Sequence, residues 1–133
     1  MELQSVESCG AAGDEKAHEF FDMSPIEMVI KMYEGAIGHI EDARDALEDE
    51  QVEEFKWNLN RSRLIVEELK RTLNFKEGGQ LSAQLKDLYN FVLDSLKQAE
   101  LTHRVDFLTK AIDPLEILLD GWRGAAQSVA MVS

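Results

Sequence analysis

Residues 24–40 read SPIEMVIKMYEGAIGHI, a helix start followed by the first turns of an apolar helix face. Ser24 is a favourable N-cap, Pro25 suits the first helical position, and Glu27 is placed to close a capping box with Ser24. The acidic run at residues 48–50 opposes the dipole at a helix end, so we predict that the helix stops there. The apolar residues recur at the spacing of one helix face: Ile26, Ile30, Tyr33, Ile37, Ile40 and Leu47.

Three further segments show the same period. The second starts near Glu53 and Glu54, and the breaker pair Gly78–Gly79 is expected to end it. Its apolar positions are Phe55, Leu59, Ile65, Val66, Leu69 and Leu73. Those of the third are Leu81, Leu85, Leu88, Val92, Leu96 and Ala99. Those of the fourth are Leu108, Ala111, Leu115, Leu118 and Trp122.

Four amphipathic segments joined by short links predict an all-α protein, an antiparallel up-down four-helix bundle. Pro114 falls inside the fourth segment, so this helix either kinks there or is broken, with Asp113 capping a new segment. Residues 1–22 show neither helical nor strand period and are expected to form a flexible N-terminal arm. We therefore divide the chain into this arm, a bundle over residues 23–126 and a frayed C-terminal tail over residues 127–133.

Composition excludes several classes of function. The chain has 133 residues, 44% of them hydrophobic, and a formal net charge of −12. One domain with a core is expected, while the acidic charge disfavours nucleic acid and anionic lipid as partners. Cys9 is the only cysteine, which excludes an internal disulfide. Neither a signal peptide nor an apolar run long enough for membrane insertion is recognisable, so we expect a cytoplasmic protein.

The candidate chemical motifs do not combine into an active site. The sequence Glu-x-x-His, which occurs in di-metal carboxylate proteins, is present at Glu15/His18 and at Glu100/His103. The first pair falls in the predicted arm and the second at the junction between the third and fourth helices. We therefore expect no catalytic residue, no metal and no cofactor, and a di-metal enzyme is the least favoured alternative.

The apolar faces are wider than two bundle neighbours require. At 100° per residue, the third helix spreads its apolar residues over roughly 200° of its circumference: Leu88, Tyr89, Phe91, Val92 and Leu93. Met28 and Met32 widen the face of the first helix in the same way. Such faces either fill a core or leave a groove for another helix. For the set as a whole we favour the groove.

The order of motifs along residues 23–124 resembles the flagellar secretion chaperone family. The first helix contains SPIEM at residues 24–28 and KMYEGAI at residues 31–37. The second contains LIVEEL at residues 64–69, followed by Leu73-Asn74 and then Gly78-Gly79. The pattern closes with Leu85-x-x-Leu88-Tyr89-x-Phe91 in the third helix and Leu115-x-x-Leu118 and Trp122 in the fourth. Two departures are Glu100, where the family usually has Asn, and Pro114 in a helix that is commonly continuous.

This resemblance implies a cytosolic export chaperone that binds the C-terminal helical segment of flagellin. Binding would prevent premature polymerisation and keep flagellin competent for export, and components of the export apparatus would be further partners. The runner-up is a bundle of the same family that binds another helical partner or acts as a regulator. The candidate partner-binding residues are Met28, Met32, Tyr33, Leu85, Leu88, Tyr89, Phe91 and Val92.

Phe20 and Phe21 are the apolar pair of the predicted arm. Two roles stay open for them. They either fold back over part of the groove and compete with the partner, or they form a hydrophobic staple at the entry to the first helix.

Overall fold

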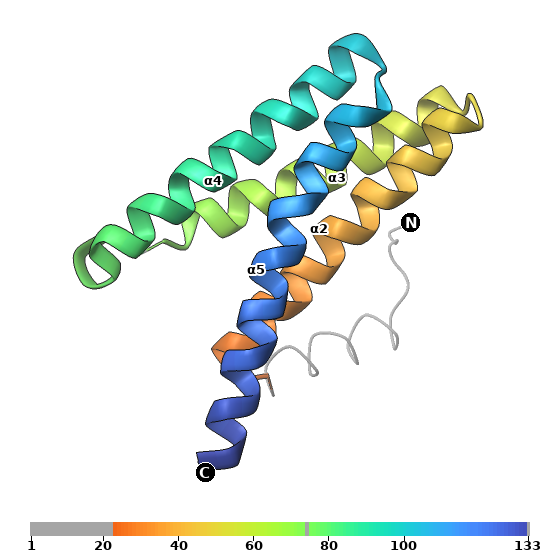
Figure 1. Ribbon diagram of the computed structural model, residues 1–133. Coiled ribbons are helices and arrows are strands. Elements are labelled where there is room, and N and C mark those ends of the chain that lie inside the picture. Colours follow the sequence, from red (N-terminus) through yellow and green to blue (C-terminus); the bar gives the residue numbers. More distant parts are fainter. Residues whose placement is uncertain (1–22, 74, 133) are drawn as a thin grey trace, which may run out of the picture.

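The computed structural model describes residues 23–73 and 75–132. In these ranges the chain forms helices α2 (Pro25–Glu48), α3 (Val52–Arg71), α4 (Phe75–Thr102) and α5 (Val105–Val132), and no strand. Successive helices run in opposite directions (Figure 1). The prediction of an all-α four-helix bundle is confirmed. The predicted arm, with Cys9, Glu15, His18, Phe20 and Phe21, lies outside the described residues.

Helix α2 begins and ends as its sequence predicts. The Glu27 amide donates to Ser24 Oγ at 3.3 Å, and the Ser24 amide donates to Glu27 Oε1 at 2.9 Å, which closes the capping box. The hydrogen bond from the Ser24 amide lowers the pKa of the Glu27 carboxyl below its usual value. The helix stops at Glu48 and Asp49 caps it, while Glu50 takes a left-handed φ of 59° that turns the chain towards α3.

The boundary between α3 and α4 differs from the prediction. Helix α3 already ends at Arg71, with Thr72 as its C-cap, and α4 begins at Phe75. Gly79, with φ 53° and ψ −123°, interrupts the start of α4 and does not end α3. Expecting the second helix to reach the glycine pair was therefore wrong. Leu69 and Leu73 keep the spacing of one helix face although α3 ends between them at Arg71. The apolar pattern alone therefore does not show where this helix ends.

Helix α5 passes through Pro114 as one helix and continues to Val132. It is therefore not broken at Pro114, although the proline removes one backbone donor. The helical conformation also extends past residue 126, where the bundle was expected to give way to a frayed tail.

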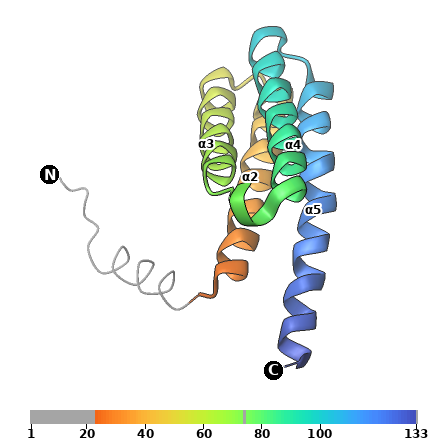
Figure 2. The ribbon, with the colours of Figure 1, turned by 90° about the vertical axis from the view of Figure 1, so that its left-hand side faces the viewer.

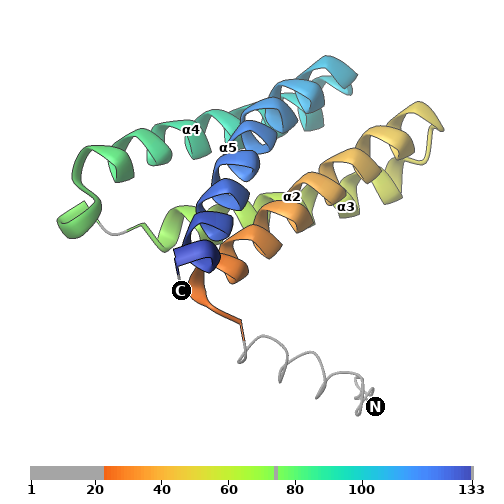
Figure 3. The same ribbon diagram turned by 60° about the horizontal axis from the view of Figure 1, so that its bottom comes forward.

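The four helices form a ring in which each packs on two neighbours. Helix α2 packs on α3 and α5, and α4 packs on the same two, so α2 and α4 lie on a diagonal. Figure 2 shows the ring, with α3 and α5 on opposite sides. Figure 3 shows that α5 starts beside α4 and ends near the start of α2. The largest fully buried side chains come from all four helices: Tyr33, Ile40, Phe55, Val66, Leu69, Tyr89, Val92, Leu96, Leu108 and Leu115.

Candidate binding groove

An open groove of ≈ 390 Å³ runs between α2 and α3 on the outside of the bundle. Met32 and Ile65 are partly buried and pack on the core, so they form its floor, whereas Leu64 is 47% exposed. Met28 lies one turn before Met32 on the same side of α2 and is also exposed. The residues that line this α2–α3 groove are Lys31, Met32, Arg61, Leu64, Ile65 and Glu68.

Trp57 extends the apolar surface one turn beyond Arg61 on α3. Its side chain is 57% exposed, and its ring meets the His39 ring of α2 edge-on, with 5.6 Å between centroids. His39 is held by a 2.9 Å hydrogen bond between its Nδ1 and Asn58 Oδ1. The Arg61 guanidinium lies 5.3 Å from the centroid of the Trp57 ring. An exposed tryptophan fixed by its neighbours is a favourable contact for a partner, because aromatic side chains bury much area at little entropic cost.

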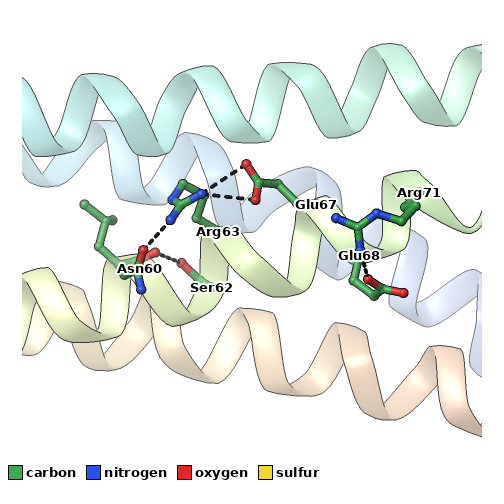
Figure 4. Close-up of polar contacts among 7 residues, drawn as sticks. Asn60, Ser62, Arg63, Glu67, Glu68 and Arg71 are labelled. Atoms are coloured by element: carbon green, nitrogen blue, oxygen red, sulfur yellow. Dashed lines mark hydrogen bonds and ion pairs between the residues drawn. The ribbon is translucent and has the colours of Figure 1, made fainter.

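The other arginines of α3 are engaged by carboxylates. Arg63 donates to both carboxylate oxygens of Glu67 at 3.1 Å, and Arg71 donates to Glu68 (Figure 4). These pairs stand three or four residues apart on the exposed surface, where such pairs contribute a few tenths of a kcal/mol each. They occupy charge that would otherwise be available to a partner.

Two other grooves of the bundle are charged. The groove between α3 and α4 carries residues of both signs, from Lys56 and Arg63 to Asp94 and Glu100. The groove between α2 and α5 is acidic, lined by Glu34, Glu41, Glu116 and Asp120, with Arg123 paired to Glu34 at 2.8 Å. Among these three grooves, only the α2–α3 groove is lined by an exposed large apolar side chain.

The structure divides the eight candidate residues between the core and the surface. Tyr33, Leu85, Tyr89 and Val92 are buried in the core. Buried side chains can touch a partner only if the bundle opens, so these four are core residues in the free protein.

The other four candidates lie on two different surfaces. Met32 lines the α2–α3 groove, and Met28 is exposed one turn before it on the same side of α2. Leu88 is partly buried on α4, and Phe91 of the same helix is 50% exposed. Because α2 and α4 are diagonal, the two methionines and this pair do not form one groove. Whether any of the eight contacts a partner stays a prediction.

Sequence reasoning did not single out Trp57, Arg61, Leu64 and Ile65 as binding residues. Ile65 was assigned to the apolar face of the second helix, and Leu64 was only part of a family motif. Trp57 and Leu64 both lie off that face, seven residues apart and therefore on one side of a helix. That spacing is the signal that could have identified a second apolar stripe.

Nothing in the described ranges combines into a metal site or a membrane helix. Glu100 is exposed in the last turn of α4, and His103 lies in the link to α5, its ring edge-on to Phe55 at 5.3 Å. No group of three His, Cys, Asp or Glu residues within residues 23–73 and 75–132 could hold a metal ion. No helix of the described chain is long and apolar enough to span a membrane.

Comparison with known proteins gives concordant matches. The sequence model of the family described as flagellar protein FliS matches residues 10–129. The flagellar secretion chaperone FliS of Campylobacter jejuni is 29% identical over 100 residues, which cover 75% of this chain and 78% of that protein. The protein of the same name from Bacillus subtilis is 29% identical over 105 residues, 79% of this chain and 77% of that protein. A crystal structure of a bacterial flagellar chaperone superposes with a TM-score of 0.74 at 25% identity, covering 86% of this chain and 98% of the other.

Proposed function

The chain belongs to the family of the flagellar protein FliS, a family of chaperones in flagellar export, and on that premise we propose that it binds the C-terminal helical segment of flagellin. Bound in this way, the segment is kept from polymerising before export. We place the protein in the cytoplasm and expect export components among its further partners. We also propose that it catalyses no reaction.

The observation that carries this proposal is the open apolar groove between α2 and α3. An amphipathic helix binds such a groove by its apolar face, with anchors that recur every three or four residues. Met32 in the floor and Met28 beside it are flexible and polarisable, so they adapt to different anchors. A flagellin segment that is disordered when free becomes ordered as it binds. As a helix it makes its backbone hydrogen bonds within itself, so the chaperone needs to supply only side-chain contacts.

The test is calorimetry with a peptide that covers the C-terminal helical segment of flagellin from the same cell. We expect one peptide per chaperone, a gain of helicity, and a negative heat-capacity change, because apolar surface is buried. A peptide from the N-terminal half of the same flagellin is the control. Absence of binding at tens of micromolar would contradict the proposal.

A pair of variants locates the site. Leu64→Ser removes an exposed apolar side chain from the groove and should weaken binding at least tenfold, since well-placed interface anchors contribute about 2 kcal/mol or more. Ile117→Ser removes an apolar side chain that is 72% exposed on α5, away from this groove, and should leave affinity unchanged. Equal losses in both variants would place the site elsewhere.

The runner-up is that the same bundle holds another helical protein or acts as a regulator. Purification from the source cell, followed by mass spectrometry of the co-eluting proteins, separates the two. Flagellin as the stoichiometric companion supports the proposal. A different stoichiometric companion, with no flagellin, supports the runner-up.

A further inference from the structure

We infer that the α2–α3 groove selects a helix with two apolar anchors two turns apart and a carboxylate between them, and that Arg61 binds this carboxylate. The inference rests on the proposed function, since it names the chemistry of the segment that the groove accepts. It is carried by the arrangement of Trp57, Arg61 and Leu64 along one side of α3.

The two apolar contacts set the spacing of the anchors. Trp57 and Leu64 are seven residues apart, which corresponds to about 10 Å along a helix at about 1.5 Å per residue. Both are exposed, and Leu64 stands above the floor of Met32 and Ile65. A helix that lies along the groove meets them with residues i and i+7, whichever way it runs.

Arg61 lies between these two contacts. Its neighbours three and four residues away on α3 are Trp57, Asn58, Leu64 and Ile65, none of which is a carboxylate. Within the described residues no ion pair is found for Arg61, whereas Arg63 and Arg71 are each paired (Figure 4). Its charge is therefore available to a partner.

The Trp57 ring orients the guanidinium of Arg61. At 5.3 Å from the ring centroid, the cation is within the range of a cation–π contact, which limits the rotamers that it samples. A guanidinium fixed in this way binds a carboxylate through two parallel hydrogen bonds with less loss of freedom than a mobile lysine. Lys31 on the opposite side of the groove lies 3.8 Å from Glu34, so its charge is partly engaged.

The local charge at Arg61 favours an acidic segment, although the molecule as a whole is acidic. The chain carries −12 overall, so most of its surface repels carboxylates. An unpaired arginine between two apolar contacts is a local exception. A helix with a carboxylate at i+3 or i+4, between its anchors, is the ligand that satisfies all three residues.

The experiment uses a designed helical peptide with leucines at i and i+7 and with Glu, Gln or Lys at both i+3 and i+4, so that either direction of the helix is tested; it is titrated into the full chain. Calorimetry and tryptophan fluorescence, to which the exposed Trp57 and the partly buried Trp122 both contribute, report binding. The Glu peptide should bind about fivefold more tightly than the Gln peptide, the upper range for a solvent-exposed charge pair. The Lys peptide should bind more weakly than both.

Variants assign this preference to Arg61. With Arg61→Gln the Glu and Gln peptides should bind equally, and with Arg61→Glu the order of the Glu and Lys peptides should reverse. Arg63→Gln, on the α3–α4 side, is the matched control and should keep the preference of the natural protein. A Glu preference that survives in Arg61→Gln, or is lost in Arg63→Gln, would overturn the inference.

The outcomes also separate this inference from the proposed function. If the flagellin peptide binds and is insensitive to Arg61→Gln, the inference fails and the proposed function stands. If the designed Glu peptide binds through Arg61 while the flagellin peptide does not bind, the groove preference stands and the proposed partner is wrong.

Discussion

Two tyrosine hydroxyls meet across the diagonal of the bundle. Tyr33 Oη of α2 and Tyr89 Oη of α4 are 2.5 Å apart, and both side chains are buried. Burial raises the pKa of both phenols, and for Tyr89 the hydrogen bond with Tyr33 raises it further. The neutral pair thus satisfies two polar groups that would be costly to bury singly.

The pair should make the bundle sensitive to alkali. An unfolded tyrosine ionises near pH 10, while the folded phenols hold their protons to higher pH. The unfolded state therefore binds fewer protons above about pH 10, and the free energy of unfolding falls as pH rises through this window. We expect the Tm to fall steeply there, together with the appearance of tyrosinate absorbance on melting.

The double variant Tyr33→Phe with Tyr89→Phe is the comparison, because the chain has no other tyrosine. Its Tm should fall less steeply above about pH 10, where only other groups still titrate. Tyr33→Phe alone should be less stable at neutral pH by about 1–3 kcal/mol, since it leaves the Tyr89 hydroxyl buried without its partner. Parallel pH profiles of the natural protein and the double variant would contradict this account.

The same residues show what the sequence could and could not predict. Tyr33 was placed correctly on the apolar face of the first helix, but it was also a candidate for binding. Periodicity gives the direction of a side chain on its own helix, and not which helix faces it across the core. The hydroxyl contact with Tyr89 requires the ring order of the helices, which only the folded chain supplies.

At the scale of the helices, local signals predicted both ends of α2 but not the boundary between α3 and α4. The capping box of α2 is short-range chemistry, fixed by Ser24 and Glu27 alone, and it is present as predicted. Where α3 ends at Arg71, the local signal is weak: Lys70 and Arg71 stand in the last turn and Thr72 is the C-cap. The glycine pair does mark an interruption of helical geometry, but at the start of α4 and not at the end of α3.

Gly79 and Gly124 give a matched pair for testing that break. Gly79 has a φ of 53° and a ψ of −123°, a conformation that a side chain disfavours, so Gly79→Ala should destabilise the protein by about 1–2 kcal/mol. Gly124 is an exposed helical residue of α5 with open space around its Cα, so Gly124→Ala should stabilise it by up to about 1 kcal/mol. Urea unfolding of both variants measures the two changes. Stabilisation by Gly79→Ala would show that α4 is continuous there.

At the scale of the whole molecule, topology decides which apolar side chains are available. The ring order α2–α3–α4–α5 buries one side of every helix and leaves shallow grooves between neighbours. The wide faces predicted for α2 and α4 therefore serve the core with Tyr33 and Tyr89 and separate outer surfaces with Met28 and Phe91. The width of each apolar helix face could be predicted from the sequence. Which part of that face packs in the core and which part lies on the outer surface could not.

The net charge of −12 predicts how the bundle responds to salt. Like charges repel in the compact state, and the ion pairs, such as Arg63–Glu67 and Arg123–Glu34, are exposed and contribute little each. Raising NaCl from about 0.01 M to about 0.5 M shortens the screening length from roughly 30 Å to a few ångströms, so it weakens the repulsion most. At neutral pH we expect the Tm to rise by several degrees.

The same titration near the isoelectric point of ≈ 4.6 is the control, because the net charge then vanishes while the general effects of NaCl on apolar burial remain. The rise in Tm should be much smaller there. A fall in Tm with salt at neutral pH would mean that the exposed ion pairs outweigh the repulsion. In that event the acidic side chains would stabilise the bundle through their ion pairs with basic side chains. Arg61, which has no such pair within the described residues, would then be an exception on this surface.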